Sequence, residues 1–587
     1  MNLSKVKKTL EDIFNKEPME GKKRNIVFWY DDEGEFAEDI GELKLDNAKF
    51  LELKSNNSFY IKYLLEKEDT QSNYLLYSPV SKPMPKDNWL LDILKYSEEF
   101  STDKSVLIMR DLKVEDLSLR NVFKGYLKFF GNKERYRKFA SYHIDKYTKE
   151  KVDIGVLSTL CKLPVLDFEQ VVKKILIEGL EGENKYLEGI RSFGDIDAFW
   201  DLIEKRYGYI YEDKSLEKLM IMFLITHLSY TLEENLPTTW QEYISAKRSN
   251  SIVFISNFMN HSIYGEAFDS LADKTQATLN VKGYLDKWDI DKYIECDTFR
   301  VFDEVIIDRI RGNLLENIGE FDRYRKIINK RRISHWFEVY RNEYECLYFA
   351  IGLLEMEKQM NGAIKPETAH DLIEAYTKEY YLMDYFYRKF YFHYDKIFDK
   401  DPFEKLAAKI ENTYTHWYLN ELSIKWSAAV QREMLEDYPL VGIKQQKDFY
   451  KDFVSPFIRN DERIFVIISD ALRYEAGQEL LDLINKEARG VADIEFMQGV
   501  IPSTTKYGMT SLLPRENLLL NDKGDLIVDG ISSQGTVNRG KIIEGYNDNT
   551  RAISYLDMID MRRADYKEAF GGKKLIYIYH DAIDAAG

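Results

Sequence analysis

The sequence predicts a multidomain protein in which two α/β domains flank a long helical region. Three observations predict it. Strand-like apolar runs alternate with helical segments at both ends of the chain, and such runs are rare in between. The length of 587 residues is also too great for a single hydrophobic core. We therefore expect an N-terminal α/β domain at 1–115, a helical middle region at 116–455 and a C-terminal α/β domain at 456–587.

The N-terminal domain is predicted from four segments. "NIVFWYDDEGEF" begins with an apolar strand at 26–30, and "NYLLYSP" gives a second strand at 73–79, which Pro79 ends. The apolar spacing in 88–100 indicates a helix, and 105–112 is a further strand candidate. This alternation favours a small parallel or mixed sheet.

An acidic run follows the first strand of this domain. Asp31, Asp32 and Glu33 imitate an acidic metal site, but no glycine-rich phosphate-binding loop comes after them. We therefore interpret the domain as a degenerate α/β module used for protein contact.

The middle region is predicted to be helical because apolar residues recur at spacings of three and four. The clearest examples are 216–230, 335–360 and 371–398. Its most basic stretch, "RYRKIINKRRISHW" at 323–336, is interpreted first as a solvated helix face. A contact with a nucleic-acid backbone is the alternative.

The C-terminal domain again alternates strands and helices. A buried strand is expected at 463–470, and a second strongly buried strand at 574–584 ends in a histidine and acidic residues. Between them we expect a helix at 475–488, a strand and turn in 492–505, a short helix at 506–514, a short strand at 525–530 and a polar, glycine-rich loop at 529–542.

The chain ends at Gly587, directly after that last strand. A strand buried on both faces needs neighbours and covering helices. We therefore expect the chain to be a C-terminally truncated fragment of a longer protein whose remainder completes the sheet.

Composition restricts the function classes. The net charge of −17 and the pI near 5.2 exclude a generic nucleic-acid coat, which needs a basic surface. Three widely spaced cysteines form no disulfide framework and indicate a reducing compartment. The N-terminus has no signal-peptide pattern, and no apolar run approaches about 18 residues. These features predict a cytoplasmic protein that does not associate with membranes.

Candidate chemistry gathers in three segments of the C-terminal domain. Asp470 ends the strand in "FVIISDALRYE", where α/β folds place ligands. "IPSTTKYGM" puts Ser503, Thr504 and Thr505 before a helix, whose first N–H groups favour a phosphate. "YHDAID" places His580, Asp581 and Asp584 at the end of the second strand.

Each of these residues also has a purely structural interpretation. Asp470 could simply end a strand, Thr505 could be a helix N-cap, and His580 could hydrogen-bond within the end of the sheet. Asp581 would point away from His580 if the strand continued, so Asp584 is the better candidate for a ligand.

These blocks resemble a known family. "SDALRYEAGQEL" followed by "VIPSTTKYGMTSLLP" and then "LIYIYHDAIDAAG" is similar to the PglZ domain of the alkaline phosphatase superfamily. The N-terminal "NIVFWYDDEGEF" and "NWLLDILKYSEEFS" resemble the start of type A PglZ proteins, which belong to the BREX phage-exclusion systems of bacteria.

The resemblance implies a site with two divalent ions, Zn²⁺ or Mn²⁺. Asp470 would bind one metal, and Asp584 with His580 would supply ligands for the other. Thr505 would be the nucleophile, with Thr504 as the alternative and Ser503 behind both. The remaining superfamily ligands, an Asp-His pair and a further histidine, are expected beyond residue 587, so this chain alone would lack a complete two-metal site.

Two arginines are further candidates for phosphate contacts. Arg473 follows Asp470 in the family-like pattern and is a candidate bidentate donor to phosphate; holding Glu475 or a neighbouring helix is the alternative. Arg539 lies in the polar stretch at 529–542, where a solvated loop is the first interpretation.

The resemblance thus implies a metal-dependent phosphoesterase of bacterial phage defence, acting on phosphodiesters, including nucleic acid, or on monoesters. The implied partners are other BREX proteins, such as BrxB and the methyltransferase component, and DNA is a further candidate. The second hypothesis is a non-catalytic scaffold of a multiprotein defence complex, which the long helical region favours.

Overall fold

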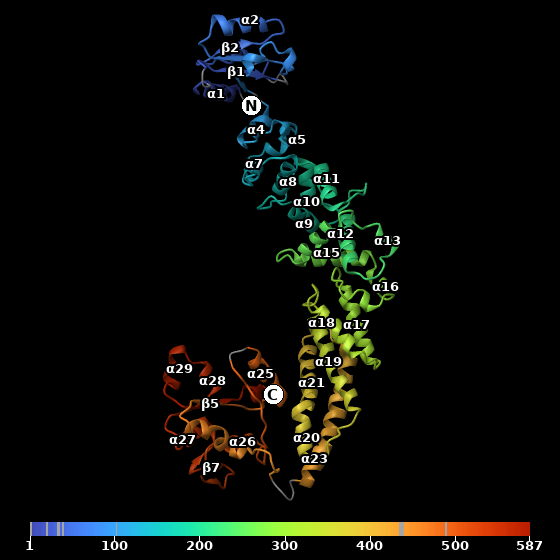
Figure 1. Cartoon of the computed structure of the whole chain (residues 1–587), viewed down its shortest axis with the longest axis vertical. Helices are drawn as coiled ribbons and strands as arrows, with labels where there is room; N and C mark the ends of the chain where they lie inside the picture. Colours follow the sequence, from blue (N-terminus) through green and yellow to red (C-terminus); the bar gives the residue numbers. More distant parts are fainter. Residues whose placement is uncertain are drawn as a thin grey trace. The chain divides into compact units, whose positions relative to one another are not determined.

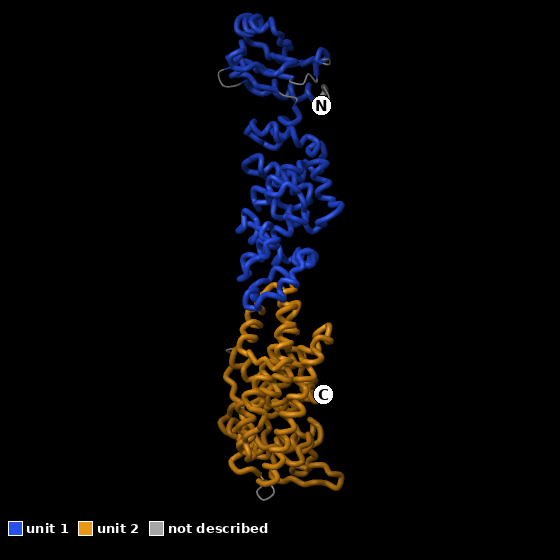
Figure 2. The backbone as a smooth tube through the Cα atoms, turned by 90° about the vertical axis from the view of Figure 1, so that its right-hand side faces the viewer, with its two compact units in different colours: residues 1–299 blue, residues 300–587 orange. Residues whose placement is uncertain are grey.

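The predicted mixture of helical and α/β parts is confirmed in a computed structural model of the chain. The structure describes residues 3–18, 22–31, 36–37, 40–100, 103–433, 439–487 and 490–586. It forms two units, residues 1–299 and 300–587, which Figure 2 colours separately. The three-part division near residues 115 and 455 stays a prediction.

The first unit begins with a four-stranded parallel sheet in the order β2-β3-β1-β4. Its strands are β1 (Ile26–Tyr30), β2 (Lys49–Glu52), β3 (Tyr74–Ser78) and β4 (Glu98–Phe100). The strands predicted at 26–30 and 73–79 are therefore confirmed. They pair with each other in register, Ile26 beside Tyr74 and Tyr30 beside Ser78.

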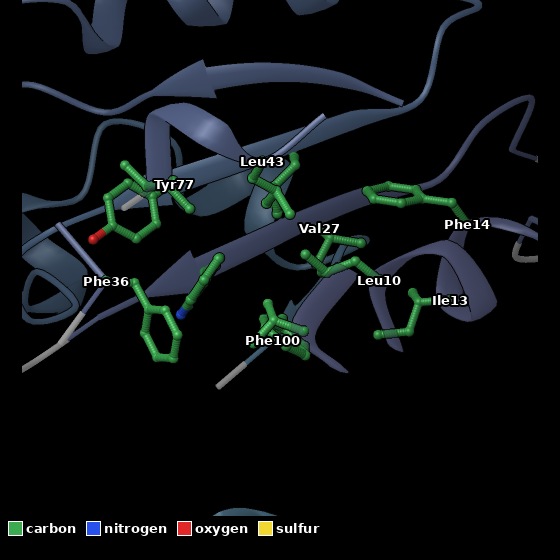
Figure 3. Packing of buried hydrophobic residues seen from close by; sticks show 12 residues of the cluster. Leu10, Ile13, Phe14, Val27, Phe36, Leu43, Tyr77 and Phe100 are labelled. Atoms are coloured by element: carbon green, nitrogen blue, oxygen red, sulfur yellow. The ribbon is translucent and has the colours of Figure 1, made fainter. Parts of the chain in front are cut away.

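Helices cover both faces of this sheet, as a parallel sheet requires. Helix α1 (Leu3–Phe14) packs Leu10 and Ile13 against Val27 and its neighbours, as Figure 3 shows. Helices α2 (Ser58–Tyr63) and α3 (Leu91–Leu94) cover the opposite face, and α1 and α2 lie on opposite sides in Figure 1.

Two expectations in this domain were wrong. The helix predicted at 88–100 is only the short α3, and the chain then extends into β4, which pairs with β1. The strand candidate at 105–112 is helix α4 (Lys104–Asp111). The Asp103 side chain caps this helix by accepting from the Ser105 backbone N–H at 2.8 Å. Apolar periodicity alone cannot distinguish helix from strand in so short a run.

The helical character predicted between the two α/β regions is confirmed. Several of its helices begin at an Asp, Asn, Ser or Thr N-cap, such as Asp167 and Ser215. In the first unit the helices are α5 (Arg120–Gly125), α6 (Leu127–Phe130), α7 (Lys133–Ala140), α8 (Lys149–Leu160), α9 (Phe168–Glu178), α10 (Lys185–Phe193), α11 (Ile196–Tyr207), α12 (Leu216–Thr231), α13 (Thr238–Gln241), α14 (Arg248–Met259), α15 (Gly265–Thr278) and α16 (Val281–Leu285).

The second unit opens with further helices and then turns into α/β structure. The helices are α17 (Val301–Leu315), α18 (Phe321–Arg331), α19 (Arg341–Met360), α20 (Ala369–Ala375), α21 (Tyr381–Tyr394), α22 (Glu404–Glu411), α23 (Asn420–Glu433) and α24 (Ser455–Arg459). Among the described helices of both units, none combines the length and apolar character needed to cross a membrane.

A three-stranded parallel sheet follows, in the order β5-β10-β9. Its strands are β5 (Ile464–Ser469), β9 (Thr550–Ser554) and β10 (Leu575–His580). The central strand β10 is buried from Leu575 to Tyr579, and His580 at its end is half-buried. One face packs on α26 (Thr505–Ser511) and α27 (Gly535–Glu544), and the other on α28 (Tyr555–Ile559) and α29 (Arg563–Phe570).

The strand at 463–470 is confirmed, but its predicted burial is largely wrong. Strand β5 lies at the edge of the described sheet, and β10 is its single neighbour there. Val466 enters the core, whereas Phe465 is 49% and Ile467 66% exposed. An apolar run alone cannot distinguish a central strand from an edge strand.

The segments between β5 and β10 gave mixed outcomes. The helices predicted at 475–488 and 506–514 correspond to α25 (Tyr474–Lys486) and α26. The strand expected in 492–505 is reduced to one isolated bridge between Gln445 and Gln498. A small antiparallel sheet of β6 (Leu518–Leu520), β7 (Leu526–Val528) and β8 (Ile531–Ser532) contains the strand predicted at 525–530. The loop expected at 529–542 is instead β8 and most of α27.

Candidate metal and phosphate site

The structure brings the ends of β5 and β10 together. The two strands are parallel neighbours, with Ser469 in register with His580. The backbone N–H of Asp470 donates to the carbonyl oxygen of His580 at 2.9 Å. The carboxyl edge of a parallel sheet is where α/β folds bind ligands, so Asp470 and His580 share the expected edge.

Asp470 is half-buried, and its carboxylate has a local partner. One oxygen accepts from the Ala471 backbone N–H at 3.1 Å. In the described part of the chain, no side chain pairs with this carboxylate. Ala471 has a φ of +61°, in the left-handed region, so the chain turns sharply directly after Asp470. The carboxylate therefore retains lone pairs that a cation could bind.

His580 has a structural role at the end of the sheet. Its Nδ1 lies 2.8 Å from the Ser469 hydroxyl oxygen, and its ring meets Tyr555 edge-on, with centroids 4.6 Å apart. This contact agrees with the interpretation of His580 as a residue that hydrogen-bonds within the end of the sheet. Metal-binding histidines are commonly held by one ring nitrogen and bind the metal with the other, so this bond is also compatible with a metal role for Nε2.

The hydroxyl candidates lie where α26 begins. Thr504 is the N-cap and Thr505 the first helical residue, so the interpretation of Thr505 as an N-cap is wrong. The Thr504 side chain makes no capping hydrogen bond, and Ser503, Thr504 and Thr505 are all exposed. These hydroxyls are therefore accessible to a substrate.

The rest of α26 is firmly held in the domain. Met509 lies in the core beneath the sheet, and the Thr510 hydroxyl donates to the Ser533 hydroxyl at 2.7 Å. Lys506 forms an ion pair of 2.9 Å with Asp525, whose pKa is lowered chiefly by that hydrogen bond. The exposed threonines thus begin a helix whose later turn is fixed.

The two candidate arginines differ in their surroundings. Arg473 is exposed and is the N-cap residue of α25, directly after the turn that contains Asp470. The Nε of Arg539 donates to the Ser533 carbonyl at 2.9 Å, and its guanidinium lies 4.8 Å from the centroid of the Tyr579 ring. Arg539 therefore has a structural role, and its contact with substrate stays a prediction.

Glu475 does not pair with Arg473. Within the described residues its ionic partner is Arg388 of α21, with 3.4 Å between Arg388 Nε and a Glu475 carboxylate oxygen. The alternative in which Arg473 holds Glu475 is therefore not supported. Arg388 was not predicted from the sequence, because the two residues are far apart in the chain and no motif joins them.

The acidic residues after β10 are exposed. The strand ends at His580, and Asp584 lies in the short helix α30 (Ala582–Ala586). Over the described ranges, one group of three potential ligands has donor atoms within 4.8 Å of one another: His370, Asp371 and Glu374. The structure thus brings Asp470 and His580 to one edge but does not gather Asp470, His580 and Asp584 into ligand geometry.

In the acidic run after β1, Asp31 has a structural role. Asp31 is buried and accepts from the Phe36 backbone N–H at 2.8 Å and from the Tyr77 hydroxyl at 2.7 Å. Asp32 and Glu33 lie outside the described residues. Asp31 is therefore a structural carboxylate, and the use of this domain for protein contact stays a prediction.

The basic stretch at 323–336 is largely used in helix packing. Arg331 is buried and forms two hydrogen bonds with Asp303, at 2.8 and 2.5 Å. Arg325 pairs with Glu355, and Arg332 pairs with Glu345 at 2.8 Å. The expectation of a solvated face is wrong for Arg331, whose position suits a buried bidentate pair. Contact with nucleic acid stays a prediction.

Comparison with known proteins places the chain in a family. The sequence model described as "BREX system PglZ alkaline phosphatase-like domain" matches residues 449–587. The chain is 45% identical to "Alkaline phosphatase-like protein PglZ" of Bacillus cereus (strain H3081.97) over 100% of its length and 69% of that protein. It is 28% identical to "Alkaline phosphatase-like protein BrxZ" of Escherichia coli O9:H4 (strain HS), over 96% of the chain and 68% of that protein.

No solved structure matches the chain. The match to the Bacillus cereus protein extends over the whole chain and therefore spans the segments that carry Asp470, the threonine turn and His580. The resemblance expected from those motifs is confirmed, and the chain belongs to the PglZ family of alkaline phosphatase-like proteins of BREX systems.

Proposed function

We propose that the protein is a metal-dependent phosphoesterase that acts in bacterial BREX phage defence. One observation carries the proposal. In the region that matches the alkaline phosphatase-like family, the parallel pairing of β5 with β10 puts Asp470 beside His580 at the carboxyl edge of the sheet. That edge is where a phosphate and its metal ions bind in α/β enzymes.

The donor atoms at this edge are of the types that bind divalent ions. Asp470 offers a carboxylate with lone pairs available, and His580 offers its second ring nitrogen while Ser469 holds the first. Asp584 is proposed as a further ligand from its exposed position on α30. Two ions, Zn²⁺ or Mn²⁺, would neutralise the phosphate and lower the pKa of the attacking hydroxyl when bound.

The proposed reaction proceeds through a covalent intermediate on Thr505. Its hydroxyl oxygen forms a bond to phosphorus, the bond from phosphorus to the leaving oxygen breaks, and the hydroxyl proton passes to solvent or to the leaving group. Water then cleaves the phosphothreonine and releases phosphate or a phosphomonoester. Thr504 is the alternative nucleophile, and Arg473 and Arg539 are proposed to contact the phosphate.

Hydrolysis of two model esters tests the proposal. Bis-(p-nitrophenyl) phosphate and p-nitrophenyl phosphate are incubated with the complete protein, including any residues that follow Gly587, in the presence of Zn²⁺, Mn²⁺ or Mg²⁺. The variants are Asp470→Asn, Thr505→Ala and Thr504→Ala, with Ser503→Ala for comparison, because Ser503 is the least favoured hydroxyl of the same turn. We expect metal-dependent turnover that falls by about a hundredfold or more in Asp470→Asn and Thr505→Ala and is retained in Ser503→Ala.

The preferred ester would distinguish diesterase from monoesterase chemistry. If Thr504→Ala rather than Thr505→Ala abolishes turnover, the nucleophile is Thr504. Absence of turnover with every metal, in a protein that is folded by circular dichroism, would overturn the proposal.

A scaffold role is the second candidate, and the helical region favours it. The helices from α5 to α24 contain far more chain than an α/β hydrolase core needs. Partners would then be other BREX components, with DNA a further candidate. Phage protection by the Asp470→Asn and Thr505→Ala variants in cells separates the two roles. Retained protection would support the scaffold, whereas lost protection with normal protein levels would support catalysis.

A further inference from the structure

Helix α25 carries two carboxylates toward α21, beside which it lies in Figure 1. Glu475, in its first turn, is 1% exposed and faces the Nε of Arg388 at 3.4 Å. Glu479, one turn further, accepts from Arg388 at 2.9 Å and also from Lys389. Burial raises the pKa of Glu479, but the bonds from Lys389 and Arg388 outweigh it and leave that pKa below its ordinary value. Two cations of α21 thus hold two anions of α25.

Tyr474 adds a second anchor at the start of the same helix. Its ring packs against Tyr376 and Tyr381, with centroids 5.8 and 5.7 Å away, and its hydroxyl donates to the Thr377 carbonyl at 3.3 Å. Gln478 donates to the Tyr474 hydroxyl at 2.8 Å. These partners precede or begin α21, so the ionic and aromatic contacts come from the same part of the helical region.

The sheet itself contributes little to holding α25. Glu475 is the one buried residue of this helix in the described structure, and Leu480, Leu483 and Ile484 on its apolar side are exposed. The helix is therefore held from its polar side, by contacts with the helical region. This is unusual for a helix that follows a sheet strand, which normally packs its apolar stripe on the sheet.

The Asp470 turn, residues 470–473, joins β5 to the first turn of α25. Strand β5 fixes one end of this turn through its pairing with β10. Tyr474 and Glu475 fix the other end through the helical region. Because only four residues lie between these anchors, a displacement of α25 would also displace Asp470 or Arg473.

We propose that Arg388 and Tyr474 are positioning residues, through which the helical region sets the orientation of Asp470 and Arg473. The positional part of the inference rests on the contacts alone. Its consequence for metal binding rests on the proposed function. Arg388 acts by giving the buried Glu475 carboxylate a charged partner, because a buried carboxylate without one is strongly unfavourable.

Hydrogen exchange of residues 470–487 in the full protein tests the positional part. In Arg388→Ala we expect hydrogen exchange of residues 470–487 to accelerate by about tenfold or more, while the exchange of α19 stays unchanged. Arg388→Lys, which keeps the charge, should show a smaller acceleration. In the double variant Arg388→Ala with Glu475→Gln, protection should partly return, because no buried charge is left unpaired. Lys378→Ala is the matched control, since Lys378 pairs with the exposed Glu374.

Mn²⁺ titration by calorimetry tests the consequence for the site. We expect the affinity of Arg388→Ala for Mn²⁺ to fall by about tenfold, as for loss of a residue that orients a ligand, with Arg388→Lys in between. Exchange of 470–487 at the wild-type rate in Arg388→Ala would overturn the inference. If the wild type binds no Mn²⁺ while the exchange pattern is as expected, the proposed function fails and the positional inference stands.

If Arg388→Ala does not fold, the comparison of Arg388→Lys with Lys378→Ala decides whether the positional inference holds. Faster exchange of 470–487 in Arg388→Lys alone supports the inference, and equal exchange in both variants contradicts it.

Discussion

The two parallel sheets of this protein begin with similar sequences and have different surroundings. Both contain an apolar strand that runs directly into an aspartate, β1 into Asp31 and β5 into Asp470. Strand β1 has a neighbour on each side and helices on both faces. Strand β5 is an edge strand of the described sheet, with one neighbour and two exposed apolar side chains. The same local pattern therefore gives a strand enclosed on both sides in one case and an edge strand of the described sheet in the other.

The two aspartates show what this difference means for function. Asp31 is buried and bonded to Phe36 and Tyr77, so its lone pairs are used within the fold. Asp470 is half-buried and accepts from Ala471 alone among the described residues. A strand that ends in aspartate is thus weak support for a metal site. Lone pairs that the fold leaves unused are the stronger sign.

Removal of a core aromatic ring tests the difference between the sheets most strongly. Trp29 is fully buried in β1 and contacts Phe36, Tyr77 and Phe100. We expect Trp29→Ala to lower the free energy of unfolding of the N-terminal sheet by about 3–5 kcal/mol. Native-state hydrogen exchange of the β1 and β3 amides measures this. Ile467→Ala on the exposed face of β5 is the control, with an expected change within about 0.5 kcal/mol for the β10 amides.

Equal losses in these two variants would break the comparison. They would show that the exposed face of β5 is covered in solution.

Replacement of the two aspartates should give the next largest difference in stability between the sheets. We expect Asp31→Ala to destabilise the N-terminal sheet by about 1–3 kcal/mol, because the Tyr77 hydroxyl and the Phe36 N–H lose their acceptor. Asp470→Ala should change the stability of the C-terminal sheet by no more than about 0.5 kcal/mol. Hydrogen exchange of β3 and β10 amides checks both values. A large stability loss in Asp470→Ala would indicate a structural carboxylate and weaken its assignment to the metal site.

A smaller effect is expected when the tyrosine side of the same bond is changed. Burial, together with the hydrogen bond to Asp31, raises the pKa of Tyr77 well above its ordinary value. Tyr77→Phe keeps the ring and removes the donor, so we expect a loss of about 0.5–1.5 kcal/mol. Hydrogen exchange of β3 measures it. No loss in Tyr77→Phe, combined with a large loss in Asp31→Ala, would assign the stabilisation to the Phe36 N–H.

The smallest expected effect is a dependence of the local stability of α25 on pH. The folded pKa of Glu479 is lower than its ordinary value of 4.5. Its ion pairs are therefore fully present above that value and are lost as the pH falls through the lower folded pKa. We expect protection of α25 to fall as the pH drops below 4.5, while α1, which packs through apolar contacts, keeps its protection. Hydrogen exchange measured by mass spectrometry between pH 3 and 6 tests this expectation. In the double variant Arg388→Ala with Lys389→Ala, the protection of α25 should depend less on pH.

Much of the fold was predictable from local sequence. The strands at 26–30, 73–79 and 463–470 were correct because a short apolar run bounded by polar turn residues favours a strand. The helical region was correct because spacing of three and four is sustained over long segments. Helix α4 (Lys104–Asp111) and strand β4 (Glu98–Phe100) were not predicted, since an N-cap hydrogen bond and pairing with β1 decided them.

The candidate site was predictable only in part. The sequence determined which residue types end the strands and precede α26, and it was sufficient to place the chain in the PglZ family. Which of those side chains keep free lone pairs was decided by tertiary structure, since that depends on register and on distant partners. Ser469 meets His580 because β5 pairs with β10, and Glu475 meets Arg388 across about ninety residues of chain. Local propensity carries no information about such pairs, because strand register and helix docking are set by the packing of the whole unit.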